Sequence, residues 1–198
     1  MPRAQSYVFF IALLLLFAAC RPPQYTPKPR GYFRYTLPKH AYQTFDRAGY
    51  PYEFEYPVYG AILQDTNLAG DKAAFKYSID VDFPALGGRL YLDYKSITPN
   101  NTLEKLLDDA HSMSYTHTKR ADFINAKPFH NTHGVHGLFI DVGGNAASAY
   151  QFIATDSSAN FLRGALYFNA TPNADSIKPA ADFLRKDMEY MLGTLRWK

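Results

Sequence analysis

Three closely spaced histidines are the strongest candidates for metal chemistry in this sequence. They are His130, His133 and His136. Imidazole nitrogens bind Zn²⁺, and three of them around an open coordination position would resemble a hydrolytic centre. Residues three apart in a strand point to opposite faces, however, so a turn at His133 and Gly134 would be needed to bring all three together. The spacing disfavours a metal site, and we expect no bound metal.

His136 also has a structural interpretation. It shares one face of a predicted strand with Leu138, Ile140 and Val142. An imidazole on an apolar face is typically neutral and hydrogen-bonded, because burial of the charged form is costly. The pattern therefore predicts that His136 is a core residue rather than a ligand.

The serines do not form a nucleophile motif. Ser148, Ser157 and Ser158 are available, but none lies in the Gly-x-Ser-x-Gly turn of the serine hydrolases. Asp156 to Ser158 fall in a predicted hairpin turn, where Asp and Ser commonly bond the backbone. We assign no catalytic residue and no cofactor, and the sequence favours a protein that is not an enzyme.

A predicted hairpin over residues 148–169 places an arginine among aromatic side chains. If Thr155 pairs with Asn160 across the loop 156–159, Phe152 lies opposite Arg163, on a face shared by Tyr150, Phe161 and Tyr167. An arginine stacked on aromatic rings contributes about 0.5–2 kcal/mol, depending on how far it is desolvated.

Two roles are open to this arginine. It could be a structural residue that bonds carbonyl groups on the sheet, or it could contact a partner, because Arg and Tyr are enriched at binding hot spots. The candidate contact residues are Arg163, Tyr150, Phe161, Tyr167 and Asp156.

The elements that would position these residues are strands and two helices. Alternation of apolar and polar residues with a period of two predicts strands, at 52–58, 75–83, 90–94, 121–127, 135–142, 148–155 and 160–169. Apolar residues at helical spacing predict helices, at 101–113 and 176–195, with Asn101 and Glu104 spaced as in a capping box. Residues 31–49 show little periodicity and are predicted to be irregular.

Short connections between the strands imply antiparallel pairing, because parallel neighbours need long crossovers. The sequence thus predicts a single α+β domain, residues 31–198, with a largely antiparallel sheet of about seven strands and two main helices packed on it. The order of elements resembles the PsbP/Mog1-type sandwich, a likeness of fold that carries no function.

The first nineteen residues have the pattern of a signal peptide. Arg3 precedes an apolar run of eleven residues, from Tyr7 to Phe17, which is too short to span a bilayer. The segment 16–20 resembles the bacterial lipobox, whose cysteine is lipidated, for example with palmitate. Cys20 is the single cysteine of the chain, so a thioether to lipid also accounts for an otherwise unpaired thiol.

Residues 20–30 are predicted to be a lipidated cysteine followed by a proline-rich tether. Four prolines fall between Arg21 and Arg30, and they favour an extended, semi-rigid conformation. Removal of the leader would leave a net charge of +2, and no basic stripe follows, so nucleic-acid binding is not expected. We expect the domain to lie in the periplasm, held to a membrane of the cell envelope by its lipid.

Several segments resemble one known family, the gliding-motility lipoproteins GldD. They are Pro27–Arg34, Leu37–His40, Phe54–Pro57, Ala147–Phe152, Thr155–Ser157, Phe161–Phe168 and Trp197–Lys198. The resemblance implies a non-catalytic envelope lipoprotein that is needed for gliding motility and for the associated type 9 protein secretion, with motility and secretion proteins as partners. The resemblance implies no catalytic residue. The one position that it assigns is Cys20, as the lipid attachment point. The alternative is a periplasmic domain that binds a small ligand or performs metal-dependent hydrolysis.

Overall fold

The computed structural model describes residues 36–64, 76–115, 121–171 and 173–198. All of them belong to one compact unit, Tyr32–Lys198, whereas Met1–Gly31 form a second unit. The predicted signal peptide, Cys20 and the tether lie outside the described residues. Within the described residues, no helix is long and apolar enough to cross a membrane.

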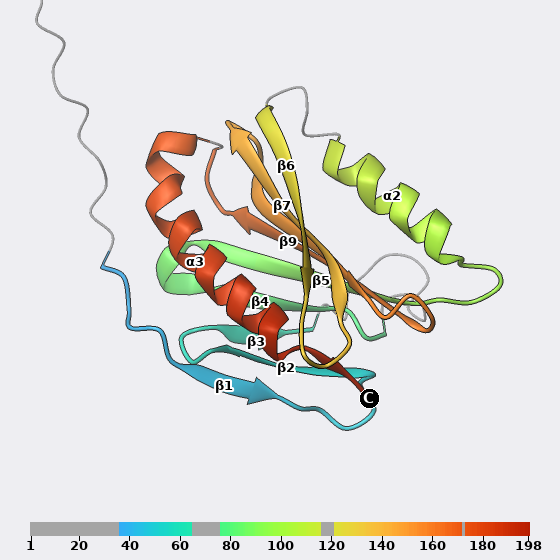
Figure 1. The fold of residues 1–198 in the computed structure, drawn as a ribbon. Coiled ribbons are helices and arrows are strands. Elements are labelled where there is room, and N and C mark those ends of the chain that lie inside the picture. The colour runs from blue at the N-terminus through green and yellow to red at the C-terminus, as the bar shows by residue number, and fades with distance from the viewer. Residues whose placement is uncertain (1–35, 65–75, 116–120, 172) are drawn as a thin grey trace, which may run out of the picture. The chain divides into compact units, whose positions relative to one another are not determined.

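The fold is α+β, with an antiparallel seven-stranded sheet between two helices (Figure 1). The strands lie side by side in the order β3-β4-β5-β9-β8-β7-β6. Their bounds are β3 Ala61–Leu63, β4 Ile79–Phe83, β5 Gly88–Ser96, β6 Ala121–His130, β7 His136–Gly144, β8 Ser148–Thr155 and β9 Asn160–Phe168. Every adjacent pair is antiparallel, as predicted from the short connections.

A second, three-stranded sheet was missed in part by the sequence patterns. It has the order β1-β2-β10, with β1 Tyr42–Phe45, β2 Tyr52–Pro57 and β10 Arg196–Trp197. β1 lies inside the stretch 31–49 that was predicted to be irregular, so that prediction was wrong there. β1 pairs with one edge of β2, and β10, which lies near the C-terminus, pairs with the other edge. A strand of four residues is too short for its alternation of apolar and polar residues to reveal such pairing.

Alternation along β4 and β5 explains how the sheet buries one face. Ile79, Val81 and Phe83 are at most 3% exposed, while Asp80 and Asp82 between them are partly exposed. A 3₁₀ turn, η1 (Pro84–Leu86), follows, and Gly87 ends it with φ +63°. That left-handed conformation is accessible to glycine at little cost, so the predicted hairpin closes here.

Helix α3 (Ala174–Thr194) covers the buried face of the sheet. Its apolar stripe was predicted correctly, and Leu184, Met188 and Met191 are at most 2% exposed. The helix begins two residues before the predicted start, because the Asn173 side chain caps it by accepting from the Ser176 N–H. Pro179 consequently lies beyond the first turn, not within it as predicted.

Helix α2 (Leu103–Tyr115) lies on the opposite face of the sheet (Figure 1). Leu106 and Ala110 pack there against residues of β7, β8 and β9. The predicted cap was wrong by one residue: Thr102 Oγ1 accepts from the Lys105 N–H at 3.4 Å. Asn101 is unavailable for that role because its backbone bridges to Thr98.

Candidate functional site

The β8–β9 hairpin does not have the register predicted from the sequence. Thr155 pairs with Phe161 rather than Asn160, so Ile153 lies opposite Arg163 and Phe152 opposite Gly164. A shift of one residue places a side chain on the other face of a sheet. The arginine therefore shares its face with Ile153, not with Phe152.

The shift follows from the turn between the two strands. Asp156 Oδ1 accepts from the backbone N–H groups of Ser158, Ala159 and Asn160 at 2.8–2.9 Å. Asn160 is thereby drawn into the turn, and Ser157 adopts a left-handed φ of 63°. Burial alone would raise the pKa of Asp156, but these hydrogen bonds outweigh it and hold the pKa well below its usual value. Asp156 shapes the hairpin.

The candidate contact residues consequently divide between the two faces of the sheet. Tyr150 is 5% exposed and packs with the core under α3, whereas Phe161 is 3% exposed and packs under α2. Arg163 and Tyr167 are half-buried, on the α2 side. The prediction that one face carries all of these aromatic residues was wrong, because it depended on the register.

Arg163 has partners within the sheet. Its Nη2 donates to Gln151 Oε1 at 3.0 Å, and Asp93 lies directly opposite on β5. Burial raises the pKa of Asp93, and the nearby Arg163 guanidinium opposes that rise. A cation beside a largely buried carboxylate stabilises its charged form.

Arg163 belongs to a group of arginine and tyrosine side chains on the same face of the sheet. We call Arg89, Tyr91, Arg163 and Tyr167 the Arg/Tyr patch. Tyr91 is 39% exposed, and its ring meets the Tyr167 ring edge-on at 5.6 Å. The Arg89 guanidinium lies 6.0 Å from the Tyr91 ring. Sequence reasoning found two of these residues and missed Arg89 and Tyr91, which cross-strand pairing with β9 brings in.

The three histidines lie at the free end of the β6–β7 hairpin. His130 pairs directly with His136, and His133 lies in the turn between them. His136 is exposed, and its Nε2 lies 2.8 Å from Ser157 Oγ, so the prediction of a core histidine was wrong. The reason is that α2 covers the other end of β7, around Ile140 and Val142. The described residues hold no group of three or more His, Cys, Asp or Glu side chains that could bind a metal ion.

Chelation is expected to leave the stability of the domain unchanged. Thermal melts of residues 31–198 with and without a chelator should coincide, since the described residues hold no group of side chains that could bind a metal ion. A ligand bound to the native state raises its stability by mass action. A fall in Tm of many degrees on chelation would therefore restore the three-histidine site.

Asp187, in the middle of α3, is a buried carboxylate that the sequence patterns did not single out. It is 2% exposed. Its Oδ1 lies 2.6 Å from His40 Nδ1 and accepts from Tyr42 Oη at 3.1 Å, while Oδ2 accepts from Tyr59 Oη. The histidine nitrogen must carry a proton, because a carboxylate only accepts. Burial, followed by the contact with Asp187, raises the pKa of Tyr42 to about 12.

Stacked rings strengthen this attachment of the N-terminal segment to α3. The His40 ring lies 4.3 Å from the Phe183 ring, and the Tyr42 ring lies 3.7 Å from the Tyr190 ring. We call His40, Tyr42, Tyr59 and Asp187 the Asp187 cluster. One signal could have revealed it: an acidic residue within the apolar stripe of a helix requires partners.

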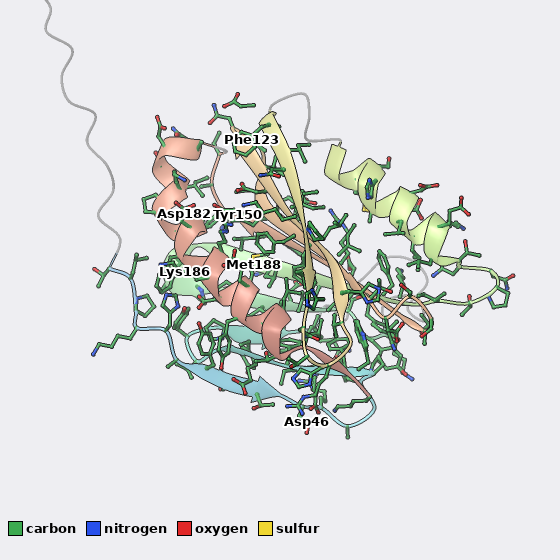
Figure 2. All side chains as sticks on the ribbon, in the orientation of Figure 1. Asp46, Phe123, Tyr150, Asp182, Lys186 and Met188 are labelled. Carbon is green, nitrogen blue, oxygen red and sulfur yellow. The ribbon has the colours of Figure 1, made fainter. Side chains whose placement is uncertain are left out.

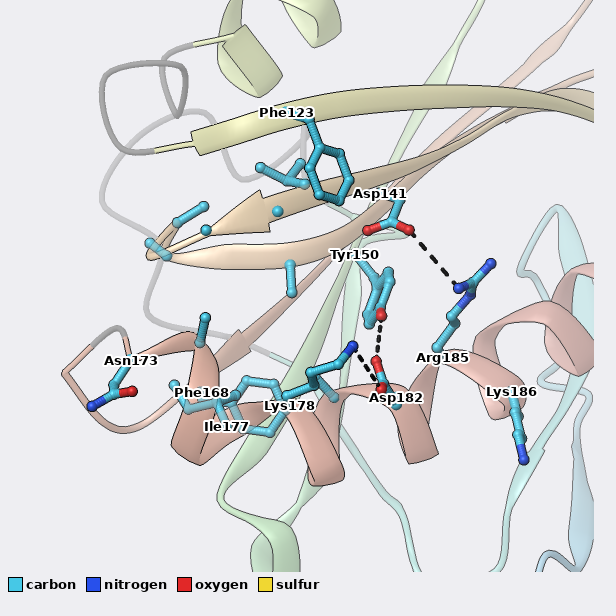
Figure 3. A pocket seen from close by; sticks show the side chains of 18 of the residues that line it. Phe123, Asp141, Tyr150, Phe168, Asn173, Ile177, Lys178, Asp182, Arg185 and Lys186 are labelled. Atoms are coloured by element: carbon cyan, nitrogen blue, oxygen red, sulfur yellow. Dashed lines mark hydrogen bonds and ion pairs between the residues drawn. The ribbon is translucent and has the colours of Figure 1, made fainter. Parts of the chain in front are cut away.

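A pocket of about 530 Å³ lies between α3 and strands β7 and β8, and we call it the α3 pocket (Figure 3). Small residues line both of its walls, including Ala147 and Ala149 on the sheet side and Ala174 and Ala181 on the helix. Side chains this short cannot fill the space between a helix and a sheet. The pocket is therefore a consequence of the sequence on both walls.

Polar groups converge on one end of the α3 pocket. Tyr150 Oη donates to Asp182 Oδ1 at 2.6 Å, and Lys178 Nζ lies 3.0 Å from Asp182 Oδ2. Figure 2 shows Tyr150 and Asp182 together between the sheet and α3. The Arg185 guanidinium lies 5.4 Å from the Tyr150 ring and within 3.8 Å of Asp141 Oδ2.

The pKa values in the α3 pocket are perturbed by this network. Burial, and then the hydrogen bond to Asp182, raises the pKa of Tyr150 well above its usual value. Burial alone would also raise the pKa of Asp182, but the hydrogen bonds from Tyr150 and Lys178 prevail and lower it. Tyr150 is therefore held as a neutral donor and Asp182 as a charged acceptor.

Phe123 forms the outer wall of the α3 pocket (Figure 3). It is 54% exposed, although it is a large apolar side chain. Its ring lies against Gly143, where an added Cβ would come within 2.1 Å of the ring. A glycine at this position lets the ring lie close to the sheet.

Comparison with known protein families matches residues 22–197 to the model described as gliding motility lipoprotein GldD. The chain belongs to this family. The match begins two residues after Cys20 and ends at the penultimate residue, so the fold described above is that of a GldD lipoprotein. No curated protein matches the chain.

Two solved structures are similar to the GldD fold. The solution structure of cyanobacterial PsbP (CyanoP) from Synechocystis sp. PCC 6803 has 13% identity and a TM-score of 0.46, over 87% of this chain and 100% of that chain. The Ran-binding protein Mog1p of Saccharomyces cerevisiae has 7% identity and a TM-score of 0.44, over 80% of this chain and 96% of that chain.

Proposed function

We propose that this protein is a non-catalytic accessory component of the cell envelope, required for gliding motility and for the associated type 9 protein secretion. The observation that carries the proposal is the family match over residues 22–197, immediately after a lipobox-like cysteine. The chemistry of the described residues is consistent with it, because the most buried carboxylate, Asp187, is engaged in holding the fold together.

In this proposal the chain has three parts. Residues 1–19 are removed as a signal peptide, residues 20–30 form the lipidated end and a proline-rich tether, and residues 31–198 form the domain in the periplasm. A proline-rich segment of this length acts as a semi-rigid spacer. The lipid would hold the domain near a membrane while the tether keeps its surfaces accessible to motility and secretion proteins.

We further propose that the Arg/Tyr patch contacts one of those proteins. Tyr91 is an exposed aromatic residue beside Arg89, and planar guanidinium groups can bind carboxylates or carbonyls through two hydrogen bonds at once. Hot spots of protein interfaces are enriched in these two residue types. Tyr150, Phe161 and Asp156 have structural roles in the core and the turn, and we leave them out of the contact.

Two substitutions of Arg163 separate a contact role from a structural one. Arg163→Lys keeps a cation beside Asp93 but removes the planar group, so we expect impaired motility and secretion at normal Tm and cellular abundance. Arg163→Ala also removes the larger of the two cationic contributions at Asp93, the other being Lys95, and should in addition lower the free energy of unfolding by about 1–3 kcal/mol. Motility, secretion, abundance and melting are measured on the same strains.

A matched change on the patch is Tyr91→Ala, which removes an exposed ring and should reduce motility at unchanged stability. Met113→Ala, at an exposed apolar residue on α2, is the control and should have no effect. Motility that follows protein abundance in every variant would show that Arg163 is a scaffold residue and would defeat the contact proposal.

A further inference from the structure

The α3 pocket has the dimensions of a ligand site. Its volume of about 530 Å³ falls within the range of roughly 300–1,000 Å³ typical of small-molecule sites. Such sites combine mostly apolar walls with a few converging polar groups. Both features are present here, since alanines and Phe123 form the walls while Tyr150 and Asp182 mark the polar end.

Helix α3 is packed differently along its two halves. In the second half, Leu184, Met188 and Met191 fill the space above the sheet and are at most 2% exposed. In the first half, Ala174 and Ala181 face alanines of the sheet, and the space between them stays open. The well-packed second half of α3 fixes the distance between the helix and the sheet. The pocket under the first half is therefore a feature of the fold.

The charges that line the α3 pocket balance one another. The acidic residues are Asp141, Asp182 and Glu189, and the basic residues are Lys178, Arg185 and Lys186. Lys178 is paired with Asp182, and Arg185 is paired with Glu189 at 2.9 Å and with Asp141 at 3.8 Å. The remaining residue, Lys186, is exposed to solvent, so a ligand with a net charge would meet no buried, unpaired charge of opposite sign among the lining residues to compensate for its lost hydration.

The walls of the pocket also offer apolar surface. Phe123 is 54% exposed and Ile177 is half-buried, and both line the pocket with the alanines. Covering such surface with an apolar group is favourable by about 25 cal/mol for each Å² removed from water. The apolar part of a ligand would lie here, and its polar part would reach Asp182 and Lys178.

We propose that the α3 pocket binds an uncharged amphipathic small molecule, with an apolar body against Phe123 and Ile177 and a neutral head that both donates and accepts hydrogen bonds at the Asp182 and Lys178 end. This binding function is separate from lipid anchoring and from the Arg/Tyr patch. Its test therefore does not depend on motility.

Photolabelling of the full-length lipoprotein in its own membranes tests the proposal. The probe is the uncharged 4-(trifluoromethyl-diazirinyl)benzyl alcohol, whose hydroxyl group donates and accepts hydrogen bonds, and the matched probe is the corresponding benzoate. Sites of labelling are mapped by peptide mass spectrometry, so probe dissolved in lipid does not interfere. We expect the neutral probe to label peptides that contain Phe123 or Ile177 about tenfold more than the carboxylate probe does. This ratio corresponds to a tenfold difference between the Kd values of the two probes.

Four variants locate the labelling. Ala147→Trp places a large ring at the exposed rim of the pocket and should abolish it, whereas Ala48→Trp, in an exposed turn elsewhere, should not. Phe123→Ala should weaken it about tenfold through loss of apolar contact. Val58→Ala, which removes exposed apolar surface outside the pocket, should leave it unchanged.

Asp182→Asn tests the charge argument separately. The pocket would then carry three basic residues against two acidic ones, so labelling by the carboxylate probe should rise relative to labelling by the neutral probe. Equal labelling by the two probes in the unmodified protein, or labelling that survives Ala147→Trp, would overturn the proposal. It would also be overturned if a photoreactive amino acid at position 147 formed a protein-sized adduct in intact cells, because a polypeptide would then occupy the pocket.

Discussion

Cys20→Ser is expected to abolish lipid attachment to the protein. The hydroxyl of serine cannot form the thioether that a lipoprotein cysteine forms, and the chain contains no other cysteine to replace it. Stable anchoring by lipid requires two or more acyl chains, and none would be attached. Incorporation of an alkyne fatty acid, detected on the protein after metabolic labelling, should fall to background, and signal removal at this site should stop.

Thr26→Ser, a conservative change in the adjacent tether, is the matched control and should keep both labelling and membrane retention. Fatty-acid label that persists on the Cys20→Ser protein would exclude lipidation at this cysteine. Loss of label with full membrane retention would show that something besides the lipid holds the protein there.

Asp187→Asn is expected to destabilise the domain by about 3 kcal/mol, because buried hydrogen bonds to a charged acceptor are replaced by weaker ones. The asparagine keeps the shape of the side chain but presents two N–H donors to a site where His40, Tyr42 and Tyr59 already donate. Chemical denaturation measures the loss, and amide hydrogen exchange in the segment 38–45 should accelerate.

Glu189→Gln is the control on the same helix. Glu189 is half-exposed and pairs with Arg185 four residues earlier, so its neutralisation should change stability by less than about 0.5 kcal/mol. An Asp187→Asn protein that unfolds at the same denaturant concentration as the unmodified one would show that the cluster contributes nothing to the fold.

The Asp187 cluster has a further consequence in the proposed arrangement. His40 lies at the start of the described domain, shortly after the proline-rich tether, and β1 follows it at Tyr42. A pull on the lipid anchor would therefore reach the domain at the point where His40 and Tyr42 are fixed to α3. The cluster would then resist detachment of this segment, in addition to stabilising the fold.

Elements with a long, regular pattern could be predicted from the sequence. The buried stripe of α3 and the alternation in β4 were correct because each is set by local periodicity, which depends on neighbouring residues alone. The antiparallel pairing of the neighbouring strands β4–β5, β6–β7, β7–β8 and β8–β9 also followed, because short connections leave no room for crossovers. The strand β3 was not predicted, and β5 pairs with β9 across a long stretch of the chain. β1 and β10 lacked such patterns, since each is short and is stabilised by pairing with β2.

The candidate contact surface shows where local reasoning failed. The residues of the β8–β9 hairpin were recognised, but its register depended on the three hydrogen bonds that Asp156 accepts within the turn. A difference of one residue moved Tyr150 to the other face from Arg163. Turn geometry of this kind depends on how a side chain folds back on the backbone, which spacing does not specify.

The sequence by itself indicated the family and the α+β class, and it predicts the secretion and lipid-attachment signals, because these are contained in contiguous residues. The tertiary structure alone decided the exposure of His136, the partners of Asp187 and the existence of the α3 pocket. Each of these depends on residues that are distant in the chain: α2 stops short of His136, His40 meets Asp187 across 147 positions, and alanines on the sheet side of the pocket lie across from alanines of α3. Contacts between such segments form only when the helices pack on the sheet, so residue spacing within one segment does not predict them.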